Sequence, residues 1–165
     1  TGCTVAWICQ AWKFKKGQRL IHAWNQTPMG YGLPAAIGAH YATGKPVLLI
    51  TGDGSLMMSI GELATIKGLP IRIALFNNLG HAMCRQSQRE WFDAEYPATS
   101  IEGGLKFPDF KAVAKAFEVD LTEYMISPHF EVIPKVIYGY PNHDMHPLLP
   151  RDELATHMET TSCPA

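Results

Sequence analysis

The segment Val47-Leu48-Leu49-Ile50-Thr51-Gly52-Asp53-Gly54-Ser55 decides the fold. Its first four residues form a continuous apolar run, which is typical of a strand buried on both faces of a parallel sheet. The run leads directly into a Gly-Asp-Gly-Ser turn, and apolar residues then recur at helical spacing over residues 56–67. We therefore expect a strand, a tight turn and a helix in succession.

A second strand is expected at residues 71–76, because Gly68-Leu69-Pro70 ends the helix and another apolar run follows it. This second run ends at Asn77-Asn78. A strand-helix-strand unit makes its two strands parallel, with a right-handed crossover between them. The chain is therefore predicted to have an α/β fold, with a parallel sheet flanked by helices.

Further elements are expected on both sides of this unit. Helical periodicity occurs over residues 5–14 and again over residues 107–117. The small residues of segment 29–39 predict a loop that enters a tightly packed helix. Residues 121–126 are expected to form a third strand, and residues 128–136 a further helix.

Composition limits the class of protein. The chain has 165 residues, is 47% hydrophobic and has a formal net charge of -1, which suits one globular domain. The sequence has no long run of basic or acidic residues, so binding to nucleic acid or to a membrane surface is not predicted. No apolar stretch is long enough to span a bilayer. The four cysteines form no CxxC pair, so a cytoplasmic location is expected. We expect the domain to cover residues 1–136, with a C-terminal tail at 137–165.

Oxygen-bearing side chains follow both central strands. Asp53 comes after the first strand and Asn78 after the second, and parallel strands present their carboxyl ends at one edge of a sheet, where α/β folds bind ligands. Mg²⁺ prefers such oxygen ligands, and the helix that starts near Ser55 offers N–H donors to phosphate. Gly-Asp-Gly alone is a common turn, but the paired motifs predict a cation that holds a diphosphate.

This pairing resembles the thiamin-diphosphate motif of thiamin-dependent enzymes, in which GDG is followed by NN after a helix and a strand. Segments 28–39, 61–66 and 144–154 are similar to acetolactate synthase-like large subunits, so the resemblance covers nearly the whole chain. It implies thiamin diphosphate and Mg²⁺ as cofactors. It also implies decarboxylation of a 2-oxo acid, with pyruvate as donor, and transfer of the two-carbon unit to a second 2-oxo acid in a homo-oligomer.

The resemblance assigns roles to individual residues. The metal ligands would be the side chains of Asp53 and Asn78 and the backbone carbonyl of Gly80. The diphosphate would lie beside Gly52, Gly54 and Ser55. Met29 would support the bent cofactor, and the carbonyl of Thr27 would accept a hydrogen bond from its aminopyrimidine. His81 and Met83 are expected beside the cofactor, with the role of His81 left open.

Three departures from the family pattern keep other functions open. The glutamate that protonates the pyrimidine belongs in this family to an N-terminal domain of a partner subunit, so such a domain or subunit is required. Ser87 stands where acetolactate synthases usually have Trp, which leaves a 2-oxo acid decarboxylase, or its split subunit, as an alternative. Residues 137–139 lead almost directly into the tail, so we expect the sheet to lack its last strand. A non-catalytic cofactor-binding or assembly fragment is the second alternative.

Other motifs carry weaker functional hypotheses. Gly30-x-Gly32-x-x-Ala35 mimics a dinucleotide-binding fingerprint, but no convincing strand precedes it. His143 and His146 are interpreted as a solvated pair rather than a zinc site. Glu62 is expected to make a buried or interface hydrogen bond, and Cys84 to be inert.

Overall fold

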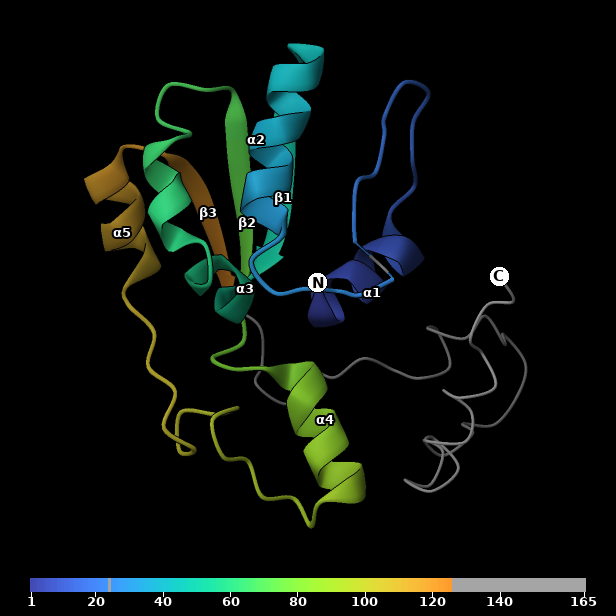
Figure 1. Cartoon of the computed structure of the whole chain (residues 1–165), viewed down its shortest axis with the longest axis vertical. Coiled ribbons are helices and arrows are strands. Elements are labelled where there is room, and N and C mark those ends of the chain that lie inside the picture. Colours follow the sequence, from blue (N-terminus) through green and yellow to red (C-terminus); the bar gives the residue numbers. More distant parts are fainter. Residues whose placement is uncertain (24, 126–165) are drawn as a thin grey trace.

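A computed structural model describes residues 1–23 and 25–125 of the chain (Figure 1). Within them, the sheet consists of three parallel strands in the order β1-β2-β3. Val47 pairs with Ile71, and Arg72 pairs with Asp120. The predicted α/β fold is confirmed. The strands are β1 (Val47–Gly52), β2 (Ile71–Asn77) and β3 (Asp120–Met125); the helices are α1 (Gly2–Ala11), α2 (Gly32–Thr43), α3 (Asp53–Met57), the 3-10 helix η1 (Ile60–Ala64), α4 (Ala82–Trp91) and α5 (Phe110–Phe117).

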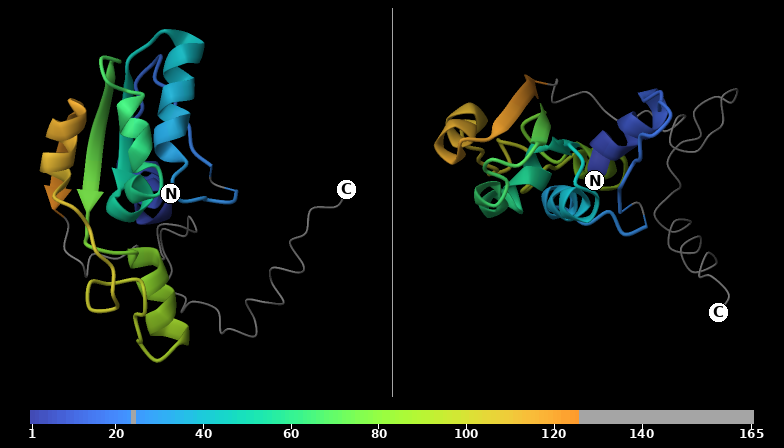
Figure 2. Two further views of the ribbon diagram at one scale, coloured as in Figure 1. Left: turned by 60° about the vertical axis from the view of Figure 1, so that its left-hand side comes forward. Right: turned by 90° about the horizontal axis from the view of Figure 1, so that it is seen from above.

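The helices are distributed unevenly about the sheet. Helices α2 and α5 and the 3-10 helix η1 pack on one face, whereas α1 lies on the other side of β1 (Figures 1 and 2). Helix α4 extends beyond the carboxyl ends of the strands (Figure 1). The hydrophobic core lies between the sheet and the first group of helices, and includes Leu33, Leu49, Leu63, Ile73, Leu75 and Phe110.

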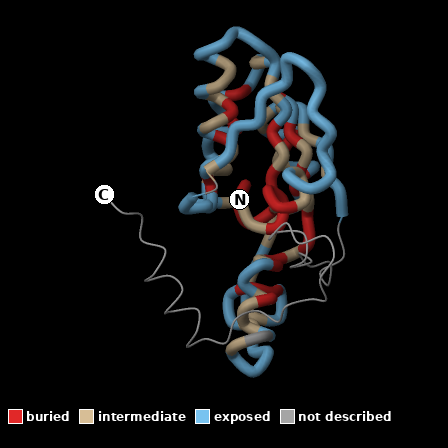
Figure 3. The backbone as a smooth tube through the Cα atoms, turned by 90° about the vertical axis from the view of Figure 1, so that its right-hand side faces the viewer, coloured by how far each residue is buried: buried red, intermediate tan, exposed pale blue. Residues whose placement is uncertain are grey.

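The second face of the sheet is largely open within the described residues. Leu48 is 51% exposed, whereas its neighbour Leu49, which belongs to the core cluster, is 6% exposed. Figure 3 colours the backbone by burial and shows buried and exposed stretches in close succession along the chain. The contact that α1 makes with this open face places the Trp7 ring 6.2 Å from that of Phe76. The expectation that β1 is buried on both faces therefore fails at Leu48, because no helix within residues 1–23 and 25–125 covers this side chain.

Several helix boundaries differ from the sequence prediction. The helix expected over residues 56–67 is instead two short segments, α3 and η1, because Ser59 has non-helical backbone angles (φ -132°, ψ 23°). The opening helix expected over residues 5–14 begins at Gly2 and ends at Ala11, since Trp12 is extended. Helix α5 begins at Phe110 rather than at residue 107, because the Asp109 carboxylate caps it by accepting hydrogen bonds from Lys111 N and Ala112 N.

The loop and helix expected from segment 29–39 are present, because α2 begins at Gly32. Its last residue is Thr43, and Gly44 after it adopts the left-handed conformation typical of a helix C-terminus. The helix expected at 128–136, the 137–165 tail, the absent last strand and the His143/His146 pair all lie outside the described residues. Among the residues that are described, no helix is long and apolar enough to cross a membrane.

Candidate functional site

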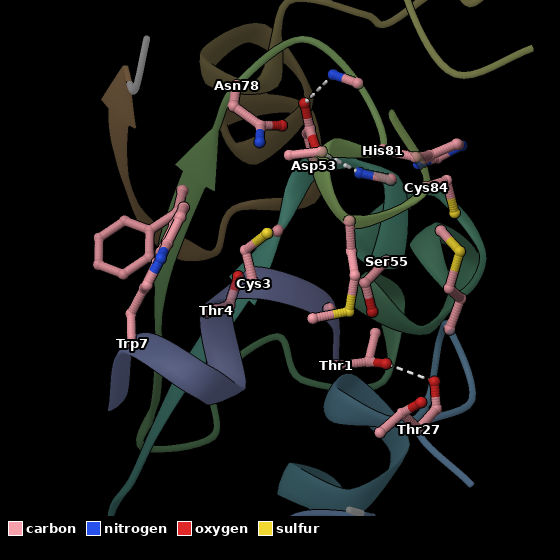
Figure 4. A pocket seen from close by; sticks show the side chains of 18 residues that line it. Thr1, Cys3, Thr4, Trp7, Thr27, Asp53, Ser55, Asn78, His81 and Cys84 are labelled. Carbon is pink, nitrogen blue, oxygen red and sulfur yellow. Dashed lines mark hydrogen bonds between the residues drawn. The ribbon is translucent and has the colours of Figure 1, made fainter. Parts of the chain in front are cut away.

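A pocket lies at the carboxyl ends of β1 and β2, bordered by α1, α3 and α4 (Figure 4). Its lining comes from four separate segments of the chain, within residues 1–7, 27–29, 52–55 and 76–84. The ten residues predicted from the sequence all line it: Thr27, Met29, Gly52, Asp53, Gly54, Ser55, Asn78, Gly80, His81 and Met83. The fold therefore brings these residues together, while their roles remain predictions.

Asp53 connects the two halves of the pocket. It is the first residue of α3 and is only 2% exposed. Its Oδ1 accepts a 2.7 Å hydrogen bond from Gly54 N, and its Oδ2 accepts a 3.0 Å hydrogen bond from Gly80 N (Figure 4). The carboxylate thus holds the loop after β2 against the turn after β1.

Burial raises the pKa of the Asp53 carboxyl above its ordinary value, because removal from water disfavours the charged form. The N–H groups of Gly54 and Gly80 and the nearby His81 ring lower the pKa in opposition to burial, but they do not cancel its effect. A divalent cation would compensate the buried charge. Asp53 is therefore a carboxylate whose surroundings favour either a proton or a metal ion.

The loop after β2 has an unusual backbone that presents Asn78 and Gly80. Leu79 adopts a left-handed conformation (φ +55°), which is uncommon for a residue with a branched side chain. The Leu79 N–H donates to the Asn77 side-chain oxygen at 3.0 Å. The His81 N–H donates to the Thr99 carbonyl, also at 3.0 Å, so hydrogen bonds fix both sides of Gly80.

Glycine is required at position 80 by close approach. A Cβ built there would lie 2.0 Å from Arg85 Nη1 and 2.4 Å from the Thr99 carbonyl oxygen. Arg85 Nη1 itself donates to that carbonyl at 3.2 Å. The loop of residues 96–104 therefore packs directly on the backbone of the predicted metal-binding loop.

Because Gly54 has no side chain, it leaves a space, here called the Gly54 cradle, that the side chains of His81 and Met29 approach closely. A Cβ at this position would lie 2.3 Å from the His81 ring and 3.1 Å from Met29 Cε. The space that the missing side chain leaves is thus occupied by the His81 ring, which places that ring beside the turn after β1 (Figure 4). Met29 is 38% exposed, so part of its side chain remains free to contact a ligand.

The loop before α2 is held against α3. Ser55 Oγ accepts a 3.1 Å hydrogen bond from Gly30 N, and Gly30 has a positive φ of 83°. A Cβ at Gly30 would come within 3.0 Å of Met58 Cβ. The Thr27 carbonyl accepts a hydrogen bond from the Thr1 hydroxyl, so this carbonyl faces the pocket end near α1 (Figure 4).

The start of α1 is the part of the site that sequence reasoning missed. Thr1, Gly2, Cys3, Thr4 and Trp7 line the pocket, and the first turn of α1 faces the same space as Asp53 (Figure 4). The sequence periodicity begins only at Val5, so it hid the earlier helix start. No capping signal could have found it, because the Thr1 side chain makes no cap hydrogen bond and Gly2 has a positive φ of 62°.

Three smaller predictions concern residues near or outside the pocket. Cys84, predicted to be inert, lines the pocket and is exposed. Glu62 is exposed and accepts a 3.0 Å hydrogen bond from the Thr65 hydroxyl, so the hydrogen bond is not a buried one, and the interface alternative stays a prediction. Ser87 on α4 donates to the Met83 carbonyl at 3.3 Å.

The donor set suits a hard cation. The pocket brings together the buried Asp53 carboxylate, the Asn78 amide and the backbone of Gly80. Asn78 is 7% exposed, and within residues 1–23 and 25–125 its amide has no hydrogen-bond partner, which leaves its oxygen available. The same described part contains no group of three or more His, Cys, Asp or Glu that could hold a metal ion. Oxygen ligands of this kind fit Mg²⁺ completed by phosphate or water, rather than zinc.

Comparison with known proteins gives a consistent result. The family model described as "Thiamine pyrophosphate enzyme, C-terminal TPP binding domain" matches residues 1–140. The acetolactate synthase large subunit of Parasynechococcus marenigrum (strain WH8102) is 42% identical over 95 residues, which cover 56% of this chain and 15% of that protein. The acetolactate synthase isozyme 2 large subunit of Escherichia coli (strain K12) is 37% identical over 116 residues, which cover 68% of this chain and 21% of that protein. For the chloroplastic acetolactate synthase 2 of Nicotiana tabacum, the identity is 40% over 111 residues, with 64% and 16% covered. The chain thus spans only about a fifth or less of the length of these relatives.

Proposed function

Since the chain belongs to the thiamine pyrophosphate enzyme family and matches its C-terminal cofactor-binding domain, with acetolactate synthases among its relatives, we propose a specific ligand for its pocket. The pocket binds thiamin diphosphate through Mg²⁺. The observation that carries the proposal is the hydrogen bond from Gly80 N to Asp53 Oδ2, because it unites the two sequence motifs in one site. Buried oxygen ligands at the carboxyl edge of a parallel sheet are what a cation-bound diphosphate requires.

We assign the metal ligands to the side chains of Asp53 and Asn78 and to the Gly80 carbonyl. The diphosphate lies beside Gly52, Gly54 and Ser55, where backbone N–H groups and a hydroxyl are available to it. The organic part of the cofactor contacts Met29 and the Thr27 carbonyl, with His81 and Met83 beside it. These assignments rest on the position of all ten residues around one pocket.

The bound cofactor would supply an electron sink for loss of carbon dioxide from a 2-oxo acid. The residues of this chain bind and orient it: Asp53 neutralises the cation, the Gly54 cradle leaves room for His81, and the Thr27 carbonyl fixes one end. We propose pyruvate as donor and a second 2-oxo acid as acceptor. A 2-oxo acid decarboxylase remains the alternative, because Ser87 departs from the usual tryptophan.

We also propose that the complete enzyme contains more than this chain. The alignment covers only 21% of the Escherichia coli relative, so an N-terminal pyrimidine-binding domain or subunit and a homo-oligomer are expected to complete the site. In this proposal residues 1–136 form the cofactor-binding domain and residues 137–165 a tail. A cytoplasmic location stays a prediction, since some relatives are named as chloroplastic proteins.

Calorimetric titration of thiamin diphosphate into the chain, with and without Mg²⁺, tests the proposed binding. We expect Mg²⁺-dependent binding that Asp53→Ala weakens by at least about a hundredfold, with a comparable loss for Asn78→Ala. The matched control is Asp120→Ala, which removes an exposed carboxylate on β3. Binding that is absent in the folded chain, or equal in Asp53→Ala and the control, would contradict the proposal and favour a non-catalytic fragment.

Activity is a separate question with its own experiment. Carbon dioxide release from pyruvate should require addition of an N-terminal pyrimidine-binding subunit to the chain, together with thiamin diphosphate and Mg²⁺. If acetolactate forms, the carboligase assignment holds. Acetaldehyde as the sole product would instead support the decarboxylase.

A further inference from the structure

The side chain of Asn77 joins β3 to the loop that carries the proposed metal ligands. Asn77 is the last residue of β2 and is 4% exposed. Its Nδ2 donates to Glu123 Oε1 at 2.7 Å, and its Oδ1 accepts from Leu79 N at 3.0 Å. Glu123 lies on the neighbouring strand, where it pairs in register with Leu75.

These two partners determine the orientation of the Asn77 amide. A backbone N–H can only donate, and an ionised carboxylate can only accept. A reversed amide would place its NH₂ group against the Leu79 N–H and its oxygen against the Glu123 carboxylate. Glu123 therefore selects the orientation in which Asn77 Oδ1 faces the loop.

The loop depends on that oxygen. Leu79 is held with a φ of +55°, a conformation that costs free energy for a non-glycine residue and persists only where neighbours enforce it. The next residue, Gly80, places its N–H on Asp53 Oδ2. Asn78 and Gly80 thus flank the one residue whose backbone is fixed by Asn77.

We infer that Glu123 is a positioning residue for the cation site, acting through Asn77 to hold the Leu79 turn in which Asn78 and Gly80 face Asp53. This inference rests on the proposed function for its consequence in cofactor binding. The hydrogen bonds from Glu123 through Asn77 to Leu79 are made entirely by residues of this polypeptide and do not depend on the proposed function. Neither Glu123 nor its role follows from the GDG and NN motifs.

The key variants change what Glu123 offers to Asn77. Glu123→Leu removes the acceptor and leaves the buried Asn77 Nδ2 without it, whereas Glu123→Gln retains an oxygen acceptor. Glu123→Asp keeps the charge but withdraws the oxygen by one methylene, so it decides the question should Glu123→Leu fail to fold. The matched control is Asp120→Leu, which removes a carboxylate from the same strand where the side chain is exposed.

The first readout is hydrogen exchange of the Leu79 amide in the chain without cofactor. We expect exchange to accelerate by about tenfold or more in Glu123→Leu, less in Glu123→Asp, and to stay within about twofold of wild type in Glu123→Gln and Asp120→Leu. Equal exchange in all variants would overturn the inference. This readout is independent of whether thiamin diphosphate binds.

The second readout is the Mg²⁺ concentration that half-saturates binding of thiamin diphosphate. It should rise about five- to tenfold in Glu123→Leu and hardly change in Asp120→Leu. Because Glu123 acts through Asn77, the double variant Asn77→Ala/Glu123→Leu should match Asn77→Ala alone, and additive losses would overturn the inference. Failure of wild type to bind the cofactor would refute the proposed function, and the Leu79 exchange rates would then decide the positioning role by themselves.

Discussion

Asp53 Oδ2 accepts a 3.0 Å hydrogen bond from the backbone N–H of Gly80, which lies 27 residues later in the chain. The contact is possible because β1 and β2 are adjacent and parallel, so the residues that follow them meet at one edge of the sheet. The two halves of the proposed cation site are therefore aligned by a hydrogen bond within the chain. Such preorganisation reduces the ordering that binding must otherwise impose.

Replacement of Gly80 by alanine should destabilise the chain. The new Cβ would lie 2.4 Å from the Thr99 carbonyl, a backbone atom that cannot move without displacing its loop. We expect a loss of about 1–3 kcal/mol in the free energy of unfolding, measured by urea denaturation. The Arg85→Ala change should not rescue this variant, because it leaves the clash with Thr99 in place.

Gly61 provides the control for this experiment. A Cβ at Gly61 meets no atom within 4 Å, so Gly61→Ala should leave the free energy of unfolding unchanged or raise it by a few tenths of a kcal/mol, roughly. If Gly80→Ala were as stable as Gly61→Ala, the loop after β2 would have to be looser than its hydrogen bonds indicate.

Gly54→Ala should act on ligand binding more than on stability. Here the clash is with the His81 ring at 2.3 Å, and a side chain can rotate away where a backbone carbonyl cannot. We expect Mg²⁺-dependent affinity for thiamin diphosphate to fall by about tenfold or more, as measured by calorimetry. The double variant Gly54→Ala/His81→Ala should recover part of that affinity, and a loss at least as large in the double variant would argue against the cradle.

The central part of both fold and site was predictable from the sequence, because the strand, GDG turn, helix and NN spacing are local signals whose meeting point follows from parallel topology. The start of α1 was not, since Thr1, Cys3 and Thr4 enter the pocket only through tertiary packing. The same holds for Glu123, which contacts Asn77 across 46 residues through a strand pairing that no spacing rule identifies. Ser59 interrupts a helix whose apolar periodicity is continuous, so local backbone geometry overrode the pattern there.

The buried carboxyl of Asp53 predicts a particular pH dependence of stability without metal or cofactor. Its folded pKa is raised above the ordinary 3.8, so the unfolded chain releases this proton at lower pH than the folded chain does. The contribution of Asp53 to stability should therefore fall as pH rises from about 3.8 and reach its full loss above the folded pKa. Below both pKa values, Asp53 is protonated in both states and contributes no pH dependence.

Comparison of wild type with Asp53→Asn isolates this effect. The variant keeps the shape of the side chain and removes the titration, so a constant offset from altered hydrogen bonding does not affect the slope. The unfolding free energy of wild type minus that of the variant should decrease as pH rises above about 3.8, as measured by urea titrations at a series of pH values. An increase over that range would mean that the Gly54 and Gly80 hydrogen bonds outweigh burial and lower the pKa of Asp53.

Adjacent leucines of β1 test whether the open face of the sheet contributes to folding of the chain. Leu49 is 6% exposed and belongs to the core cluster, so Leu49→Ala should cost about 2–5 kcal/mol in the free energy of unfolding. Leu48 is 51% exposed on the opposite face, and Leu48→Ala should cost less than about 1 kcal/mol by the same measurement. The two substitutions remove the same atoms from the same strand, so the difference reports burial alone. Equal losses would mean that the Leu48 face is covered in solution by polypeptide outside residues 1–23 and 25–125, and a dependence of the Leu48→Ala loss on protein concentration would identify that cover as a second copy of the chain.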